Sequence, residues 1–111
     1  MNLFKIPGVK KDYVVPVNDI IRVEAVSNYS RIYFSDGKQM IVAKVLHWFE
    51  EKLPMETFAR VHRSHLINSQ FIQKINGSND ETLLLYNGEA ITMSRRKKQS
   101  FVLSKANELP N

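Results

Sequence analysis

The stretch "IYFSDGKQMIV", residues 32–42, carries a strong signal for a β-hairpin. The Asp36-Gly37 pair stands between two runs that are rich in β-branched and aromatic residues. An Asp-Gly pair readily takes up the positive φ angles of a type I′ turn, which joins adjacent antiparallel strands. We therefore predict a β-hairpin centred on this pair.

The same design recurs near the C-terminus, in "LLLYNGEAITM", residues 83–93. Asn87-Gly88 takes the place of the Asp-Gly pair, so a second tight hairpin is predicted. A longer polar turn, residues 76–80, separates the apolar runs 71–75 and 82–86. These two hairpins share a strand, which predicts a three-stranded meander from about Phe71 to Met93.

Two upstream segments, "YVVPV" and "IIRVEAV", are typical of short strands, and Pro16 in the first favours an edge position. The segment "VAKVLHWFEEKL", residues 42–53, breaks the β pattern. Its apolar residues recur at helical spacing, and Pro54 follows its end. No good N-cap precedes it, so we expect a short helix that covers one face of the sheets. The fold class is therefore predicted to be mostly β with one short helix.

The stretch "FARVHRSHLIN", residues 58–68, combines two arginines, two histidines and a serine with apolar residues. It matches neither the helical nor the strand period along its whole length. We interpret it as a strand that runs into a tight turn. The concentration of hydrogen-bond donors makes it a candidate binding segment.

The chain has 111 residues and no cysteine. This length suits one domain, and the lack of cysteine excludes disulfides, thiolate metal sites and thiol nucleophiles. No apolar run is long enough for a signal peptide or a membrane span. We expect a single domain over residues 1–111 with its core at about 6–103, no cofactor, and a soluble, cytoplasmic location.

Basic residues outnumber acidic ones by sixteen to eleven, for a formal charge of +5. Their placement is more informative than the total. Residues 57–79 contain Arg60, Arg63 and Lys74 and no acid, and residues 90–107 contain five basic residues and no acid. If the two segments lie side by side, they form one positive surface suited to an anionic partner. If they do not, each is an ordinary solvated face.

Four ordered motifs carry a resemblance to a known family: "EA" with "NYS" from Glu24, "LHWFEEKL", "F.RVHRS..IN" from Phe58, and "NG..I..SRR" ending at Arg96. In order and spacing they resemble the LytTR DNA-binding domain over almost the whole chain. The resemblance implies an elongated arrangement of small antiparallel sheets, a β-β-β sandwich with little helix. It also implies a bacterial transcription regulator that binds duplex DNA sequence-specifically, with loops entering successive major grooves.

The resemblance assigns DNA contacts to three places in this chain. The expected contact residues are Asn28, Tyr29, Ser30, Arg31, His62, Arg63, Ser64, Ser94, Arg95, Arg96, Lys97 and Lys98. Guanine offers two acceptors in the major groove that match the arginine fork, so Arg63 and Arg95 are the expected base readers. Lysines and hydroxyls suit phosphates, which position the protein on the duplex. Tyr29 and His62 also have a purely structural interpretation, as half-buried sheet residues.

Other functions remain open at this point. His62 and His65 would face opposite sides of one strand and could not share a metal, so no metal site is expected. A Ser64/His62 pair lacks an orienting acid, so no enzyme is expected. Binding of RNA or single strands is an alternative, although the aromatic residues of the basic runs look like core. A protein-interaction module that retains the fold is another.

Duplex DNA is the expected partner, and the resemblance implies paired repeat sites that take two copies of the chain. RNA polymerase or a separate regulatory protein is a further candidate partner, and no membrane partner is expected. Members of the family often carry a receiver or sensor domain before this one. Because the domain begins close to Met1, we expect neither here.

Overall fold

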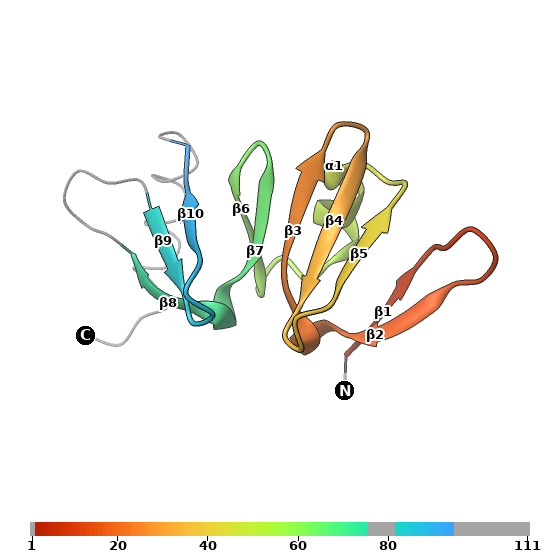
Figure 1. Cartoon of the computed structure of the whole chain (residues 1–111), viewed down its shortest axis with the longest axis horizontal. Helices are drawn as coiled ribbons and strands as arrows, with labels where there is room; N and C mark the ends of the chain where they lie inside the picture. The colour runs from red at the N-terminus through yellow and green to blue at the C-terminus, as the bar shows by residue number, and fades with distance from the viewer. Residues whose placement is uncertain (1, 76–81, 95–111) are drawn as a thin grey trace.

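Three antiparallel sheets of two, five and three strands lie in a row (Figure 1). The structure is a computed structural model and describes residues 2–75 and 82–94. Its strands are β1 Leu3–Ile6, β2 Tyr13–Pro16, β3 Ile20–Val26, β4 Tyr29–Phe34, β5 Gln39–Val42, β6 Phe58–His62, β7 His65–Asn68, β8 Ile72–Ile75, β9 Thr82–Leu85 and β10 Ala90–Thr92. Helix α1 spans Leu46–Lys52, and two short 3-10 turns span Val17–Asp19 and Ser69–Phe71. The prediction of a mostly β fold with a short helix is confirmed.

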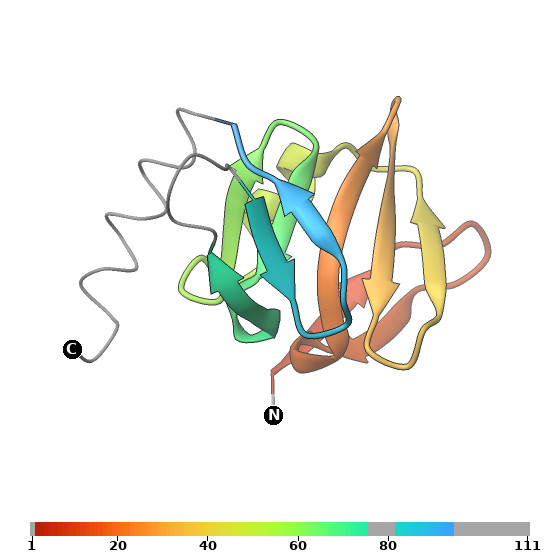
Figure 2. The same ribbon diagram turned by 60° about the vertical axis from the view of Figure 1, so that its left-hand side comes forward.

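The five-stranded sheet is the centre of the fold, with the strand order β5-β4-β3-β7-β6. Successive side chains of a strand point to opposite faces, so β3 supplies both faces of this sheet, with Ile20 and Val23 on one and Ile21 on the other. One face packs on α1 and on the β1–β2 pair. The other packs on the β8-β9-β10 meander, which lies across the β3, β7 and β6 side (Figure 2).

Two apolar cores result, one on each face of the central sheet. In the first, Phe49 of α1 is fully buried, and its ring packs against Phe4 of β1 and Trp48 at centroid distances of 6.1 and 4.9 Å. The first core consists of Phe4, Ile6, Val17, Ile20, Val23, Ile32, Val42, Leu46, Phe49, Leu53, Phe58 and Leu66. The second consists of Ile21, Val61, Ile67, Leu83, Leu85, Ile91 and Met93. Strand β1, which is not among the predicted strands, therefore closes the first core.

Both predicted hairpins form, but their turns are not of type I′. In the β4–β5 turn, Gly37 has φ +91°, and no other residue of that turn has a positive φ. Gly37 N donates to Phe34 O at 3.0 Å, and Phe34 N donates to Lys38 O at 2.9 Å. This is a three-residue loop, a type I turn followed by a left-handed glycine. The Asp36 carboxylate stabilises it by accepting from Lys38 N.

The Asn87-Gly88 turn between β9 and β10 repeats this geometry. Gly88 has φ +92°, and its N–H donates to Leu85 O at 2.9 Å. The Asn87 side chain accepts from Glu89 N at 3.0 Å. An Asp or Asn side chain that bonds to the backbone two residues ahead favours this turn over type I′, because it holds its own residue at negative φ.

The helix is shorter than residues 42–53, because Val42 belongs to strand β5 and α1 begins only at Leu46. Val42 pairs with Ser30 across β4 and β5, and this pairing takes the backbone out of helical conformation. The Ser30 hydroxyl also donates to Lys44 O at 2.7 Å, which holds the connection to α1 against β4. As expected, no side chain caps the N-terminus of α1, and the helix ends immediately before Leu53-Pro54.

Residues 58–68 form a complete hairpin, β6 and β7, with Arg63-Ser64 at the turn. The predicted strand and tight turn are therefore correct, and a second strand follows them. Asn68 ends this hairpin and is fully buried. Its amide donates to Ile20 O and accepts from Gln70 N, both at 2.9 Å, so it joins β7 to β3 and starts the next 3-10 turn.

Candidate nucleic-acid interface

Three segments that are far apart in the sequence end at one edge of the fold. The β3–β4 turn, the β6–β7 turn and the end of β10 all lie along the upper edge in Figure 1. Two backbone hydrogen bonds hold them together: Ala25 N donates to Ser64 O at 2.9 Å, and Ser94 N donates to Val61 O at 2.9 Å. Each bond joins one of the candidate segments to the β6–β7 hairpin.

The β3–β4 turn consists of Ser27 and Asn28, because Val26 pairs with Tyr29. Ser27 has φ +56°, a left-handed conformation that is uncommon for a residue with a side chain. Such conformations persist only where the surrounding strands hold them, and they concentrate at functional sites. Asn28 is exposed, and Tyr29 is 50% exposed. Tyr29 therefore stands on the surface of this edge.

Ser30 does not share this exposure, which corrects its assignment as a DNA contact. Its side chain is fully buried, and its hydroxyl is engaged by Lys44 O. The residue sits one position into β4, where the side chain points to the α1 face. Ser30 therefore has a structural role in fixing the connection between β5 and α1.

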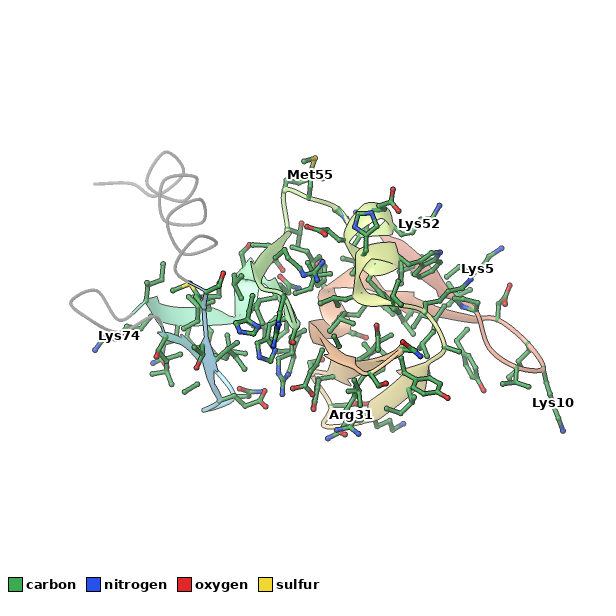
Figure 3. All side chains as sticks on the ribbon, turned by 90° about the horizontal axis from the view of Figure 1, so that it is seen from above. Lys5, Lys10, Arg31, Lys52, Met55 and Lys74 are labelled. Atoms are coloured by element: carbon green, nitrogen blue, oxygen red, sulfur yellow. The ribbon has the colours of Figure 1, made fainter. Side chains whose placement is uncertain are left out.

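Arg31 lies on the opposite face of β4, away from α1 (Figure 3). Its cross-strand neighbours are Glu24 on β3 and Ile41 on β5. The side chain is partly exposed at the flank of the edge. The Arg31 side chain therefore lies on the flank of the sheet, beside the β3–β4 and β6–β7 turns and not at their tips.

The β6–β7 turn is held by Arg60. Its Nε donates to His62 O at 3.1 Å, its Nη2 donates to Arg63 O, and its Nη1 donates to Glu50 Oε1 of α1 at 2.9 Å. The guanidinium thus fixes the turn backbone and ties it to the helix. By contrast, the Arg63 side chain is exposed and has no hydrogen bond or ion pair to any residue in the described ranges. One arginine builds the turn, and the other points away from it.

His62 also takes part in the turn. It is partly buried, and its Nδ1 accepts a hydrogen bond from Ser64 N at 3.1 Å. An acceptor at Nδ1 leaves the proton of the neutral ring on Nε2, where it is a donor. His62 therefore has a structural role in the turn through Nδ1, as anticipated, and keeps one donor at Nε2.

His62 and His65 do not lie on opposite faces, contrary to the expectation from a single strand. They are cross-strand partners on either side of the turn, and their ring centroids are 5.2 Å apart. The strand period does not apply because the chain reverses at Arg63-Ser64. In the described part of the chain, no third histidine or acid completes a metal site with them.

Beneath the edge, Arg22 of β3 links the central sheet to the meander. Its side chain is 6% exposed, and it forms a bidentate pair with Glu89 in the β9–β10 turn, at 3.1 and 2.7 Å. The guanidinium also stacks on the Tyr33 ring at 3.6 Å, and the Tyr33 hydroxyl donates to Glu24 at 2.9 Å. Both acids of this network are engaged by side chains of the fold: Glu24 by Tyr33 and, at 3.8 Å, by Arg22, and Glu89 by Arg22.

The charge states of this network follow from its contacts. Burial opposes the charge of Arg22, but the bonds to Glu89 and its charge offset this, so the pKa of Arg22 is raised. The hydrogen bonds from Arg22, and more weakly from Asn87, lower the pKa of Glu89 below 4.5. Burial is the main cause that lowers the pKa of His65 below 6.5, although Glu24 and Glu89 oppose it. Burial therefore favours the neutral form of His65 beside the Arg22–Glu89 pair.

The lowered pKa of His65 predicts a loss of stability in mild acid. Between the folded pKa and 6.5, the unfolded chain binds a proton that the folded chain does not. The free energy of unfolding should therefore fall as the pH drops below about 6.5. Urea unfolding at about pH 8 and about pH 5.5 measures this fall, which His65→Gln should reduce. His47→Gln, at an exposed histidine of α1, is the control, and an equal reduction there would contradict the assignment.

The two basic runs, residues 57–79 and 90–107, are not placed alike on the molecule. In the first run, Arg60 is paired with Glu50, and Lys74 lies at the far end of the molecule (Figure 3). Only Arg63 of that run stands at the edge with an unpaired charge, within the ranges that the structure describes. The second run begins after Ser94, and its Arg95, Arg96, Lys97 and Lys98 lie outside the described residues.

Sequence reasoning missed the residues that support this edge. Arg60 was counted with the basic surface, but its hydrogen bonds go to the turn backbone and to Glu50. Arg22 and Glu89 were not singled out, because a pair separated by 67 positions has no local signal. An arginine among the apolar residues of "IIRVEAV" was the available indication that a buried partner was required.

Comparison with known families identifies the class of protein. The family model described as the LytTr DNA-binding domain matches residues 10–104. The chain therefore belongs to the LytTR family, and the resemblance noted in its motifs is confirmed. No curated protein sequence matches the chain significantly.

A solved structure shares the fold. It is titled the LytTr DNA-binding domain of a putative methyl-accepting/DNA response regulator from Bacillus cereus. The two superpose with a TM-score of 0.76 at 23% sequence identity, over 91% of this chain and 94% of that one. The arrangement of small sheets expected of the family is therefore confirmed. No helix in the described ranges is long and apolar enough to span a membrane.

Proposed function

We propose that this chain binds double-stranded DNA sequence-specifically and acts as a bacterial transcription regulator. The observation that carries the proposal is the joining of the β3–β4 turn, the β6–β7 turn and Ser94 along one edge by backbone hydrogen bonds. Family membership and the DNA-binding title of the structural neighbour support it. Loops at this edge would enter successive major grooves, each of which is about 12 Å wide and admits a two-stranded ribbon.

The contact set follows from exposure and chemistry. Arg63 projects from a turn that Arg60 keeps rigid, which suits a bidentate contact to guanine. Ser64 and Ser94 suit phosphates, and His62 can donate from Nε2. The proposed contacts are Asn28, Tyr29, Arg31, His62, Arg63, Ser64 and Ser94, together with Arg95, Arg96, Lys97 and Lys98 beyond the described ranges.

Turns that are held in place by hydrogen bonds favour binding to duplex DNA over binding to a flexible single strand. Phe58, which could have stacked a base, is 6% exposed and belongs to the first core. Tyr29 is the exposed aromatic residue of the described edge. Proteins that bind single strands use several such platforms, each contributing about 1–3 kcal/mol per base. One platform and a set of rigid turns therefore favour the duplex.

The first experiment selects bound sequences from a random duplex pool and then sets three competitors against the selected duplex. We expect the selected duplex to outcompete random duplex, single-stranded DNA of the same sequence, and RNA. Preference for RNA or for the single strand would overturn the duplex assignment. If no duplex sequence outcompeted bulk DNA, the chain would be a protein-interaction module that retains the fold.

A paired arrangement is also proposed, with two copies on repeated sites and RNA polymerase or a separate regulatory protein as a further partner. Within residues 2–75 and 82–94, elements of one chain close both cores, so the proposal needs no dimer before DNA is present. The selected sequences test this arrangement, because two copies would leave a repeated motif with a constant spacing.

A further inference from the structure

A groove at the end of the molecule opposite the meander is not explained by DNA binding. It has a volume of about 790 Å³ and lies between the β1–β2 loop and strand β5. We propose that this groove binds an extended acidic segment of a partner protein, which adds to the edge of β5 as a further strand. The proposal is independent of the DNA interface and adds a second binding surface to the chain.

The first support is the edge itself. Strand β5 is the terminal strand of the central sheet and pairs with β4 alone in the described structure. A strand edge carries a row of unpaired N–H and C=O groups and is a template for another strand. Proteins usually protect such an edge with a charged side chain, but here the side chain in mid-strand is Ile41, which is 54% exposed. The edge of β5 can therefore accept hydrogen bonds from, and donate them to, an added strand.

The second support is the apolar lining. Val9 is fully exposed, Tyr13 is 42% exposed, and both line the groove together with residues Met40 and Ile41 of β5. An added strand would place alternate side chains against such residues, which is how strand addition combines main-chain affinity with side-chain specificity. A phosphate backbone has no apolar groups to bury there. The lining therefore favours a peptide over nucleic acid.

The third support is the charge. Lys10, Lys11 and Lys44 line the groove, and no acidic residue in the described ranges does. Two of these lysines are held in place by rings, with Lys11 Nζ at 5.4 Å from the Tyr13 ring and Lys44 Nζ at 5.7 Å from the Trp48 ring. Lysines spread around an apolar floor match a segment in which acidic and apolar residues alternate. A basic segment, such as residues 95–98 of this same chain, would be repelled.

The loop that forms the far wall is closely packed. A Cβ at Gly8 would lie 2.2 Å from Lys11 O and 2.9 Å from the Tyr13 ring, so only glycine fits. This close approach holds the loop against Tyr13 without a partner present. A preformed wall lowers the ordering cost of binding.

The test uses the full chain labelled with ¹⁵N, with no DNA present, and a blocked peptide of about seven alternating glutamates and valines. Amide chemical shifts should move saturably at residues 8–13 and 39–44 and not at the β6–β7 turn. A lysine-valine peptide of the same length should leave them in place. Saturation by both peptides alike, or by neither, would overturn the proposal.

Charge reversal provides matched variants. Lys10→Glu/Lys44→Glu should weaken binding of the glutamate-valine peptide by about tenfold or more. Lys52→Glu/Lys74→Glu has the same net charge but changes lysines away from the groove (Figure 3), and it should alter binding by less than about twofold. If both variants weakened peptide binding equally, the effect would come from net charge alone. The groove would then not be the binding site.

Two further outcomes would assign the groove to another occupant. If duplex DNA moved the same amides and displaced the peptide, the groove would belong to the DNA surface. If these amides moved on concentration of the protein alone, the groove would hold a second copy. Loss of peptide binding with intact duplex binding would overturn this proposal alone, so its failure is distinguishable from failure of the proposed function.

Discussion

Replacing Glu89 by alanine is expected to lower the free energy of unfolding by about 2–3 kcal/mol, more than any other single acid-to-alanine change in the described structure. The cost arises at Arg22, whose guanidinium is 6% exposed and would lose both of its bonds to the carboxylate. Removing one partner of a buried pair costs about 3–5 kcal/mol because a buried charge is left unpaired. Glu89 itself is 34% exposed, so water reaches the site and reduces this cost.

Urea unfolding of Glu89→Ala measures the loss, and Glu51→Ala is the control, because Glu51 is 62% exposed on α1. The control should change stability by less than about 0.5 kcal/mol. The double variant Arg22→Met/Glu89→Ala also removes the buried charge, which Glu89→Ala leaves with Glu24 at 3.8 Å as its carboxylate neighbour. It should be no less stable than Glu89→Ala. If Glu89→Ala matched Glu51→Ala, the pair would not hold the meander to the central sheet.

Replacing Arg63 by alanine is expected to reduce the preference for the selected duplex over random duplex by about tenfold to a hundredfold. This range corresponds to the loss of one bidentate base contact, about 1–3 kcal/mol. Arg63 contributes no bond to the folded turn in the described structure, whereas Arg60 supplies three. The stability of the chain should therefore be unchanged, which separates a binding effect from a folding effect.

Two lysine variants define what kind of contact Arg63 makes. Lys98→Ala should weaken binding to selected and random duplex equally and flatten the dependence on salt, because a phosphate contact carries no sequence information. Lys74→Ala removes the same charge at the far end of the molecule and should change neither. If Arg63→Ala and Lys98→Ala behaved alike, the division between base reading and positioning would be wrong.

The elements that the sequence predicts correctly depend on local chemistry. Asp36-Gly37 and Asn87-Gly88 specify hairpins because a glycine is needed at the left-handed position of each turn. The turn type is not predicted, because type I′ and the three-residue loop both need that glycine. The start of α1 is missed for a different reason: Val42 fits the helical period equally well, but pairing with Ser30 places it in β5.

The candidate site was predictable at the level of segments but not of individual side chains. "NYS" and "HRS" do end at the same edge, because the Ala25–Ser64 hydrogen bond joins their strands. Ser30 is buried although its neighbour Tyr29 is exposed, since alternate residues of β4 face opposite sides. The pairing of His62 with His65 depends on a chain reversal that the sequence placed only roughly.

The proposed function places the duplex against the edge formed by the β3–β4 turn, the β6–β7 turn and the end of β10. The most direct measurement is the map of backbone amide shifts in the ¹⁵N-labelled full chain when the selected duplex is added. We expect the largest shifts at residues 27–31, at residues 61–65 and from residue 94 onward. Largest shifts along β5 and the β1–β2 loop, or along β8 near Lys74, with the two turns unmoved, would contradict it.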